Sequence, residues 1–254
     1  MANKYVDFIS DEHLLNCVSN LHKSYLKAKN NVSKKSFYSN KVDTIKLTFD
    51  SKFNNIDEED LIQSEILRQI DKSINNSIGT FHEQVLGGIK GFEVGKLSGF
   101  DIKANDNTLF ADIKNKHNTM NSSSSEALFQ KLARYADDYK KAKCYWVQIL
   151  AKNSFNEHWK GEINGKEYSH SRVFKISGDQ FYALLSGRED ALFKLYKVLP
   201  KAIDDYLKSS KSENIEKENS ALEEINAETK KSKRTILNQI TFENYSYYLG
   251  FNKL

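Results

Sequence analysis

Proline and cysteine are scarce in this chain of 254 residues, which contains one proline and two cysteines. Cys17 and Cys144 lie far apart and form no Cys-x-x-Cys pair, which disfavours a disulfide framework and a structural zinc site. Both lie in apolar segments, so we expect them to be reduced residues of the core. The GxSxG motif of serine hydrolases is missing too, and a serine or cysteine hydrolase therefore fits the sequence poorly.

Long hydrophobic runs are also absent. No segment approaches the roughly 18 apolar residues of a membrane-spanning helix, and the N-terminal stretch MANKYVDFISDEH is too polar and acidic for a signal peptide. We therefore expect a cytoplasmic protein with no membrane partner. The 38 basic and 34 acidic residues give a net charge of +4, which is too small an excess to indicate a nucleic-acid partner by itself.

The pattern of apolar residues predicts an α/β (mixed α+β) fold, with a central mixed β-sheet flanked by helices. Helices are expected from Ser10 onward and at residues 62–85, 126–141, 178–185 and 189–207. Strands are expected at residues 99–105, 108–116, 143–150 and 172–176. Residues 29–60 are rich in Asn, Ser and Lys, and we expect them to be mostly loop.

The stretch GFDIKANDNTLFADIKNKHN at residues 99–118 carries the most informative pattern. A two-residue turn at Asp106 and Asn107, which both tolerate a positive φ, would pair Asp101 with Asp112 across two strands. Alternation then predicts a polar face with Asp101, Lys103, Asp112, Lys114 and Lys116, interrupted by Phe110. It also predicts an apolar face with Phe100, Ile102, Ala104, Leu109, Ala111 and Ile113.

Two carboxylates that oppose each other about 5 Å apart repel unless they share a proton or a cation. Neighbouring lysines favour the ionised form of both carboxylates, which disfavours a shared proton. A shared cation is therefore the better interpretation. Mg²⁺ takes one or two carboxylates together with waters and phosphate oxygens. Lys114 could hold or deprotonate an attacking water, or neutralise charge that grows on phosphorus. An amphipathic hairpin with ordinary surface charges would show the same bare pattern.

The helix before the hairpin offers a third carboxylate. Glu65 and Glu83 share one angular position on this helix, and either could point toward the aspartates. We prefer Glu83 because it lies nearer to the expected sheet in the sequence. An ordinary exposed glutamate near a helix end is the alternative.

This arrangement resembles the active site of the PD-(D/E)XK nucleases, although Phe100 stands where proline is typical. The resemblance implies that Asp101, Asp112, Lys114 and Glu83 are catalytic. It implies that Asp101, Asp112 and Glu83 bind Mg²⁺, for which Mn²⁺ can substitute.

The segments RQIDKSINNSIGTFHEQVLGG and ADIKNKHNTMN are similar to type II restriction endonucleases that recognise GGNCC. The similarity covers about residues 60–150 well and the flanks loosely. It implies a restriction-endonuclease-like PD-(D/E)XK fold and Mg²⁺-dependent cleavage of both strands of duplex DNA at a short palindromic site. It also implies a homodimer, since two-fold DNA symmetry is matched by two-fold protein symmetry, and a cognate DNA methyltransferase as functional partner.

Several polar residues after the hairpin are candidates for contact with DNA phosphates or base edges: Asn115, Lys116, His117, Asn118, Gln130 and Arg172. A structural hydrogen bond at the strand end is the alternative for His117. The serine run at residues 122–125 is expected to be a mobile loop that orders on DNA, or a plain linker.

We expect one nuclease domain over residues 1–254. Its expected parts are an N-terminal helical region, a catalytic core, a charged solvated segment or insertion, and a C-terminal segment that docks back, at residues 1–57, 58–207, 208–234 and 235–254. Two other functions stay open at this point: a structure-specific or repair nuclease of the same superfamily, and a catalytically silent DNA-binding protein.

Overall fold

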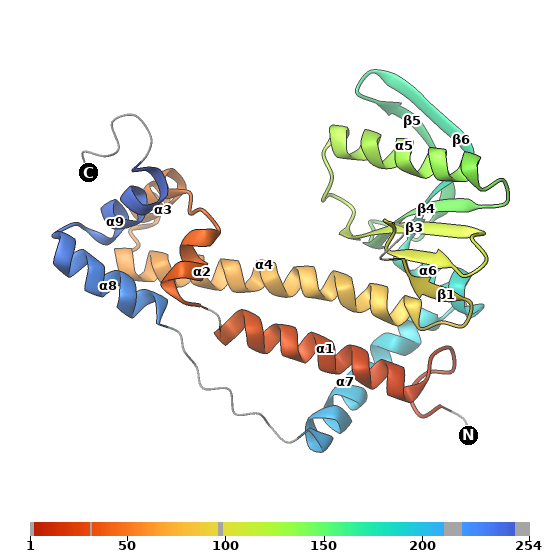
Figure 1. Ribbon diagram of the computed structural model, residues 1–254, viewed down its shortest axis with the longest axis horizontal. Coiled ribbons are helices and arrows are strands. Elements are labelled where there is room, and N and C mark those ends of the chain that lie inside the picture. The colour runs from red at the N-terminus through yellow and green to blue at the C-terminus, as the bar shows by residue number, and fades with distance from the viewer. Residues whose placement is uncertain (1–2, 31, 96–98, 211–219, 247–254) are drawn as a thin grey trace. The chain divides into compact units, whose positions relative to one another are not determined.

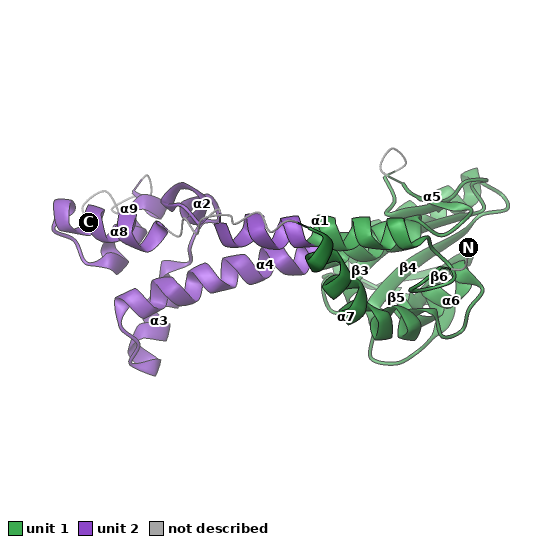
Figure 2. Cartoon of the chain, turned by 90° about the horizontal axis from the view of Figure 1, so that it is seen from below, with its two compact units in different colours: residues 1–21, 78–212 green, residues 22–77, 213–254 purple. Residues whose placement is uncertain are grey.

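A mixed six-stranded sheet forms the centre of one of two compact units in the computed structural model, which describes residues 3–30, 32–95, 99–210 and 220–246. The first unit comprises residues 1–21 and 78–212, and the second comprises residues 22–77 and 213–254 (Figure 2). The long helices α1 (Asp11–Asn30) and α4 (Glu58–Gly87) contribute to both units.

The strand order in the sheet is β1-β2-β3-β4-β6-β5. Its members are β1 (Phe92–Val94), β2 (Ile102–Ala104), β3 (Leu109–Lys116), β4 (Lys143–Leu150), β5 (Asn156–Ile163) and β6 (Lys166–Ser177). The three central strands β3, β4 and β6 run parallel, whereas β1, β2 and β5 pair antiparallel at the two edges (Figure 1). The expected α/β fold with a mixed sheet and flanking helices is confirmed.

Both faces of the central strands bury apolar side chains. On one face, even-numbered residues of β3 and β4 pack with α5 (Ser122–Asp138) in a cluster that includes Phe110, Leu132 and Cys144. On the other face, residues such as Ala111 and Val147 pack with the C-terminal part of α4, with α6 (Gly178–Ser186) and with α7 (Ala191–Ser209). The central strands β3 and β4 therefore lie between two helical layers, whereas β5 and the first half of β6 are largely exposed.

The second unit is helical. Its own elements are α2 (Lys34–Ser39), α3 (Thr44–Asn54), α8 (Ala221–Ser232) and α9 (Ile236–Tyr245). Its core joins Phe37, Ile62, Ile66, Ile225 and Ile240, all at most 1% exposed. The expectation that residues 29–60 are mostly loop is wrong, because short helices with side-chain caps at Ser33 and Asp43 fill this segment.

The expectation that residues 208–234 form a charged solvated segment or insertion is also corrected. The described part of this segment includes α8, whose Ala221 and Ile225 are fully buried, so this helix is not simply solvated. The aromatic-rich C-terminal segment packs through α9, as Ile240 shows. Residues 211–219 and 247–254 lie outside the described residues.

Two further elements differ from expectation. Residues 122–125 form the first turn of α5 instead of a loop, because Asn121 caps this helix by accepting a hydrogen bond from the Ser124 N–H at 2.9 Å. The hairpin of β5 and the first half of β6 has no counterpart in the expected strands. Among the described residues, no helix is long and apolar enough to cross a membrane.

Candidate active site

The hairpin of β2 and β3 has the expected register. Ile102 pairs with Ala111 and Lys103 pairs with Phe110, so continuation of the ladder sets Asp101 opposite Asp112. The Asp101 N–H donates to the Ala111 carbonyl oxygen at 3.0 Å, which extends the pairing to this position. The turn closes where the Asn107 N–H donates to the Ala104 carbonyl oxygen at 2.9 Å, and of Asp106 and Asn107 only Asn107 has a positive φ, of +59°. The turn chemistry thus sets the two carboxylates against each other.

Asp112 is the most enclosed charge of the site, with 9% of its surface exposed. One carboxylate oxygen, Oδ1, accepts a hydrogen bond from Lys114 Nζ, and the other, Oδ2, lies 3.3 Å from Lys131 Nζ. Lys114 follows on β3, whereas Lys131 reaches in from α5. Two ammonium groups on one buried carboxylate show that this position attracts positive charge strongly.

Asp101 stands beside this group. Its Oδ2 accepts a hydrogen bond of 2.6 Å from the Ile113 N–H. Burial raises the pKa of the Asp101 carboxyl above its ordinary value, and the negative charge of Asp112 raises it further. The Ile113 N–H and the charges of Lys114 and Lys131 oppose that rise. A cation between the two carboxylates would relieve their repulsion.

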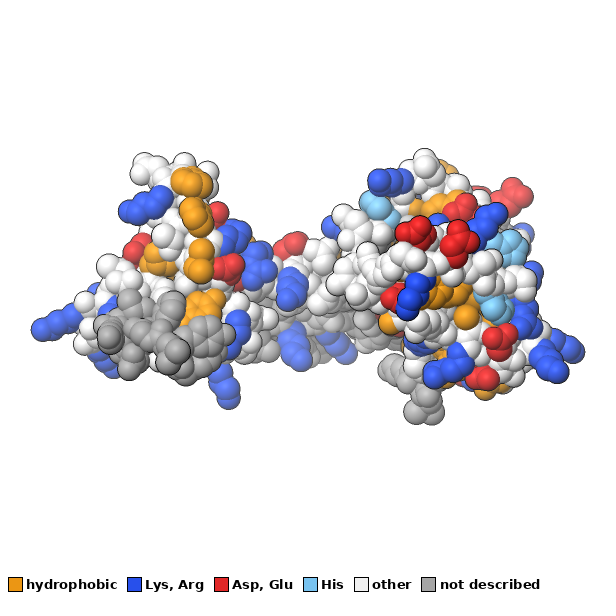
Figure 3. Space-filling model, turned by 90° about the horizontal axis from the view of Figure 1, so that it is seen from above, with side chains coloured by type: hydrophobic (Ala, Val, Ile, Leu, Met, Phe, Trp, Pro, Cys, Tyr) orange, Lys and Arg blue, Asp and Glu red, His pale blue; other side chains and the backbone are white. Residues whose placement is uncertain are grey.

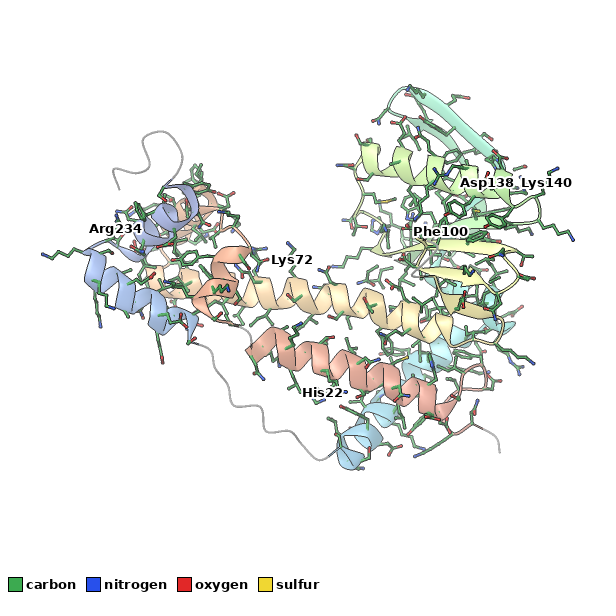
Figure 4. All side chains as sticks on the ribbon, in the orientation of Figure 1. His22, Lys72, Phe100, Asp138, Lys140 and Arg234 are labelled. Carbon is green, nitrogen blue, oxygen red and sulfur yellow. The ribbon has the colours of Figure 1, made fainter. Side chains whose placement is uncertain are left out.

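Phe100 does not lie on the face where strict alternation puts it. Its ring packs against Phe110 at 5.3 Å and Tyr135 at 4.6 Å between ring centres, on the side of the hairpin toward α5 (Figure 4). The reason is that β2 begins only at Ile102, after a bend in which Gly99 has a φ of +73°. The expected apolar face is therefore corrected at this residue.

Lys131 is a residue of the site that the sequence interpretation missed. Besides Asp112, it contacts the carbonyl oxygen of Gly99 through a hydrogen bond, and its Nζ lies 4.1 Å from the centre of the Phe100 ring. A signal was present in the sequence. Lys131 lies three residues after Leu128 and four before Tyr135, so it interrupts the apolar stripe of a helix.

An open cavity of about 410 Å³ adjoins these groups. Its walls include Asp112, Lys114, Thr119, Ser124 and Lys131. One acidic, two basic and two hydroxyl side chains therefore meet in a hollow that solvent can enter. Such a surface suits a charged, phosphate-bearing ligand.

The two glutamates of α4 differ in their surroundings. Glu65 is 7% exposed, belongs to the second unit, and is bound by Arg68 through contacts of 2.5 and 2.6 Å. Glu83 belongs to the first unit, as the aspartates do, and is half-buried. The contacts of Glu65 favour Glu83 as the helix acid. Among the described residues, however, no three His, Cys, Asp or Glu side chains gather as a group that could hold a metal.

The motif SIGTFHEQVLGG around Glu83 serves packing. Phe81, Val85 and Leu86 are at most 5% exposed in the core of the first unit. His82 Nδ1 lies 2.9 Å from Tyr182 Oη, and burial lowers the pKa of His82 from 6.5 to about 4. A Cβ on Gly87 would come within 2.6 Å of Val94 Cγ2, so only glycine permits this close approach.

The candidate DNA-binding residues occupy varied positions. Lys116 and Asn118 are exposed at the end of β3. The Nδ1 atom of His117 lies 3.3 Å from the Leu150 carbonyl oxygen, within hydrogen-bond distance. Asn115 has a buried Oδ1 with no hydrogen-bond partner among the described residues. Gln130 is exposed on α5 and donates to Glu126 at 3.3 Å.

Arg172 on β6 is engaged within the protein. It donates to the Lys140 carbonyl oxygen and lies 3.5 Å from Asp137, both of which lie at the end of α5 or just beyond it. These contacts hold the guanidinium against the end of a helix. A contact of Arg172 with a base stays a prediction.

Comparisons with known proteins identify the family of the chain. The model of the Eco47II restriction endonuclease family matches residues 6–208. The type II restriction enzyme Sau96I of Staphylococcus aureus is 40% identical over 265 residues, which cover 99% of this chain and 100% of that protein. The type II restriction enzyme Eco47II of Escherichia coli is 30% identical over 209 residues, which cover 78% of this chain and 87% of that protein. The chain therefore belongs to the Eco47II family of type II restriction endonucleases.

Proposed function

We propose that this chain hydrolyses both strands of duplex DNA at a short palindromic site of the form GGNCC. The observation that carries the proposal is the buried carboxylate of Asp112, held by Lys114 and Lys131 opposite Asp101 at the edge of an open cavity. Membership of the restriction endonuclease family supports the reaction. The IKNKHNT string and the similarity to Sau96I support this target sequence.

Mg²⁺, or Mn²⁺ in its place, fits the donor set of this site. Asp101 and Asp112 supply two carboxylates from opposed strand positions. Glu83 on α4 does not gather with them in the described structure and is proposed as a third ligand that approaches when the ion binds. Two carboxylates with waters and phosphate oxygens are a usual Mg²⁺ environment. A bound divalent ion would supply Lewis acidity toward a phosphate oxygen.

The lysines have separate tasks in the proposed reaction. Lys114 projects from the same strand face as Asp112, where its ammonium group holds the attacking water by a hydrogen bond. Lys131 approaches from α5 and offsets negative charge on the phosphate as the bond to the leaving oxygen breaks. Lys116, Asn118 and the residues beside them contact the DNA backbone beyond the cut.

Two partners belong to this proposal. A homodimer would supply one catalytic unit for each strand of a palindromic site. A cognate DNA methyltransferase would protect the same sequence in the cell that makes the enzyme.

Plasmid digestion with sequencing of the product ends tests the proposal. Purified protein with Mg²⁺ is expected to give discrete fragments whose ends share GGNCC, and EDTA is expected to stop the reaction. The Lys103→Gln variant is the control and is expected to cut as the wild type does. Lys103 lies on the same hairpin, but its ammonium group pairs with Glu93 at 3.3 Å and not with the aspartates. Cutting only at branched or damaged DNA would support a repair nuclease instead. DNA binding without cutting, in Mg²⁺ and in Mn²⁺, would support a silent DNA-binding protein.

A further inference from the structure

Helix α7 carries more apolar surface than its own unit buries. One side packs into the core through Ala191, Leu195 and Ala202, which are at most 1% exposed. The next side of the helix is also apolar but faces solvent in the described structure. Its exposed members and their exposed fractions are Phe193 with 61%, Tyr196 with 72%, Ile203 with 40% and Leu207 with 48%.

These exposed residues follow the spacing of a coiled-coil seam. With Pro200, which is also exposed, they form the stripe 193, 196, 200, 203 and 207, with steps of three, four, three and four residues. Such a repeat keeps the side chains in one line along a helix. We name these five positions the α7 stripe. Phe193 and Leu207 each lie seven residues from Pro200, while Tyr196 and Ile203 lie four and three residues from it, so an antiparallel copy can match the stripe to within one residue.

Charges beside the stripe match in the same antiparallel arrangement. Lys197 and Asp204 flank the stripe on one edge, three residues before Pro200 and four residues after it. An antiparallel second copy would place each Lys197 beside Asp204 of the other copy, twice in one contact. Neither side chain forms an ion pair within the part of the chain that the structure describes.

We propose that the α7 stripe joins two copies of this chain, antiparallel, about a two-fold axis at Pro200. The contact is isologous and therefore closes as a dimer. Helix α7 packs on the sheet face opposite α5 (Figure 1). The cavity beside Asp112 is lined in part by α5 and by no residue of α7, so the contact leaves it uncovered. This inference deepens the proposed function, which requires two catalytic units, by naming the surface between them.

Another apolar stripe lies on α3 and is a weaker candidate. Ile45, Phe49 and Phe53 are 67%, 54% and 79% exposed, and hydrophobic side chains form a row where this helix lies (Figure 3). Its flanking charges, Lys46 and Asp50, already pair with each other within the helix. These two charges are therefore not available to a second copy, and α3 serves as the control surface.

Cysteine cross-linking tests the proposed contact in the full-length protein. Pro200→Cys is expected to form a covalent dimer under mild oxidation, because position 200 meets itself at the axis. The native Cys17 and Cys144 are buried and do not interfere. Lys201→Cys, one exposed position off the stripe, and Phe49→Cys on α3 are expected to stay largely monomeric on a non-reducing gel. Cross-linking of either control as efficiently as Pro200→Cys would overturn the proposal.

Charge reversal tests the antiparallel register by sedimentation. Lys197→Glu and Asp204→Lys are each expected to weaken the dimer at least about fivefold, since each leaves like charges opposed. The double variant is expected to restore it. A monomeric wild type, or a double variant weaker than both single variants, would contradict the contact. Neither assay depends on DNA cleavage, so failure here leaves the proposed nuclease activity standing, and loss of that activity leaves the dimer result standing.

Discussion

A buried histidine next to Glu83 makes stability depend on pH in a direction that the structure fixes. His82 contacts Tyr182 Oη at 2.9 Å, and burial lowers its pKa from 6.5 to about 4. The folded protein therefore keeps His82 neutral at pH values where the unfolded chain already binds a proton there. The stabilisation is complete above pH 6.5 and is lost as the pH falls from 6.5 toward 4.

The magnitude follows from those two pKa values. Each pH unit between them is worth about 1.4 kcal/mol of unfolding free energy, so acidification from pH 7 to pH 4 removes about 3 kcal/mol through His82 alone. His82→Gln removes the titration while its amide can still bond Tyr182 Oη. Most other groups titrate alike in both proteins and cancel in the comparison.

Urea unfolding of the wild type and His82→Gln at pH 7 and pH 4.5 measures this difference. We expect the wild type to lose about 2 to 3 kcal/mol more than the variant on acidification. Equal losses in the two proteins would refute the reasoning, because His82 would then titrate alike in the folded and unfolded chains.

Four further substitutions have defined outcomes. Lys131→Met keeps the packing on Phe100 but removes a charge from Asp112, and we expect single-turnover cleavage to slow about 10- to 100-fold; an unchanged rate would remove Lys131 from the mechanism. Leu132→Ala is expected to lower the unfolding free energy by about 2 to 5 kcal/mol in urea titrations, since Leu132 is fully buried; a loss below about 1 kcal/mol would contradict the described packing. Gly178→Ala is expected to destabilise by about 1 to 3 kcal/mol because its Cβ would lie 2.6 Å from the Ile149 carbonyl oxygen. Gly79→Ala on α4 is the matched control, because a Cβ at this position would have no atom within 4 Å. We expect this change to raise the unfolding free energy by up to about 1 kcal/mol. Equal effects of the two glycine changes would refute the steric argument.

The sequence was sufficient for the hairpin because local chemistry decides it. The turn at Asp106 and Asn107 fixes the register, and period two then determines which residues oppose each other. Long apolar periodicities predicted α4, α6 and α7 for the same reason, since each repeats over several turns.

Short or composite elements escaped prediction. Residues 29–60 look loop-like in composition, yet their few apolar residues, such as Phe37 and Leu47, fold two capped helices onto the second core. The serine run at residues 122–125 is a weak helix former that Asn121 nevertheless caps. The interrupted apolar stripe marks Lys131 in the sequence, but its role depends on contact between a helix and the Asp112 strand, and the stripe does not reveal that partner.

Single-turnover cleavage of a short duplex with one GGNCC site tests the paired carboxylates most directly. The wild type, Asp101→Asn and Asp112→Asn are compared at saturating protein with Mg²⁺, with urea unfolding as the check on folding. We expect both variants to bind the duplex but cut at least about 100-fold more slowly, since each loses a negative ligand. Wild-type rates in either folded variant would contradict the account.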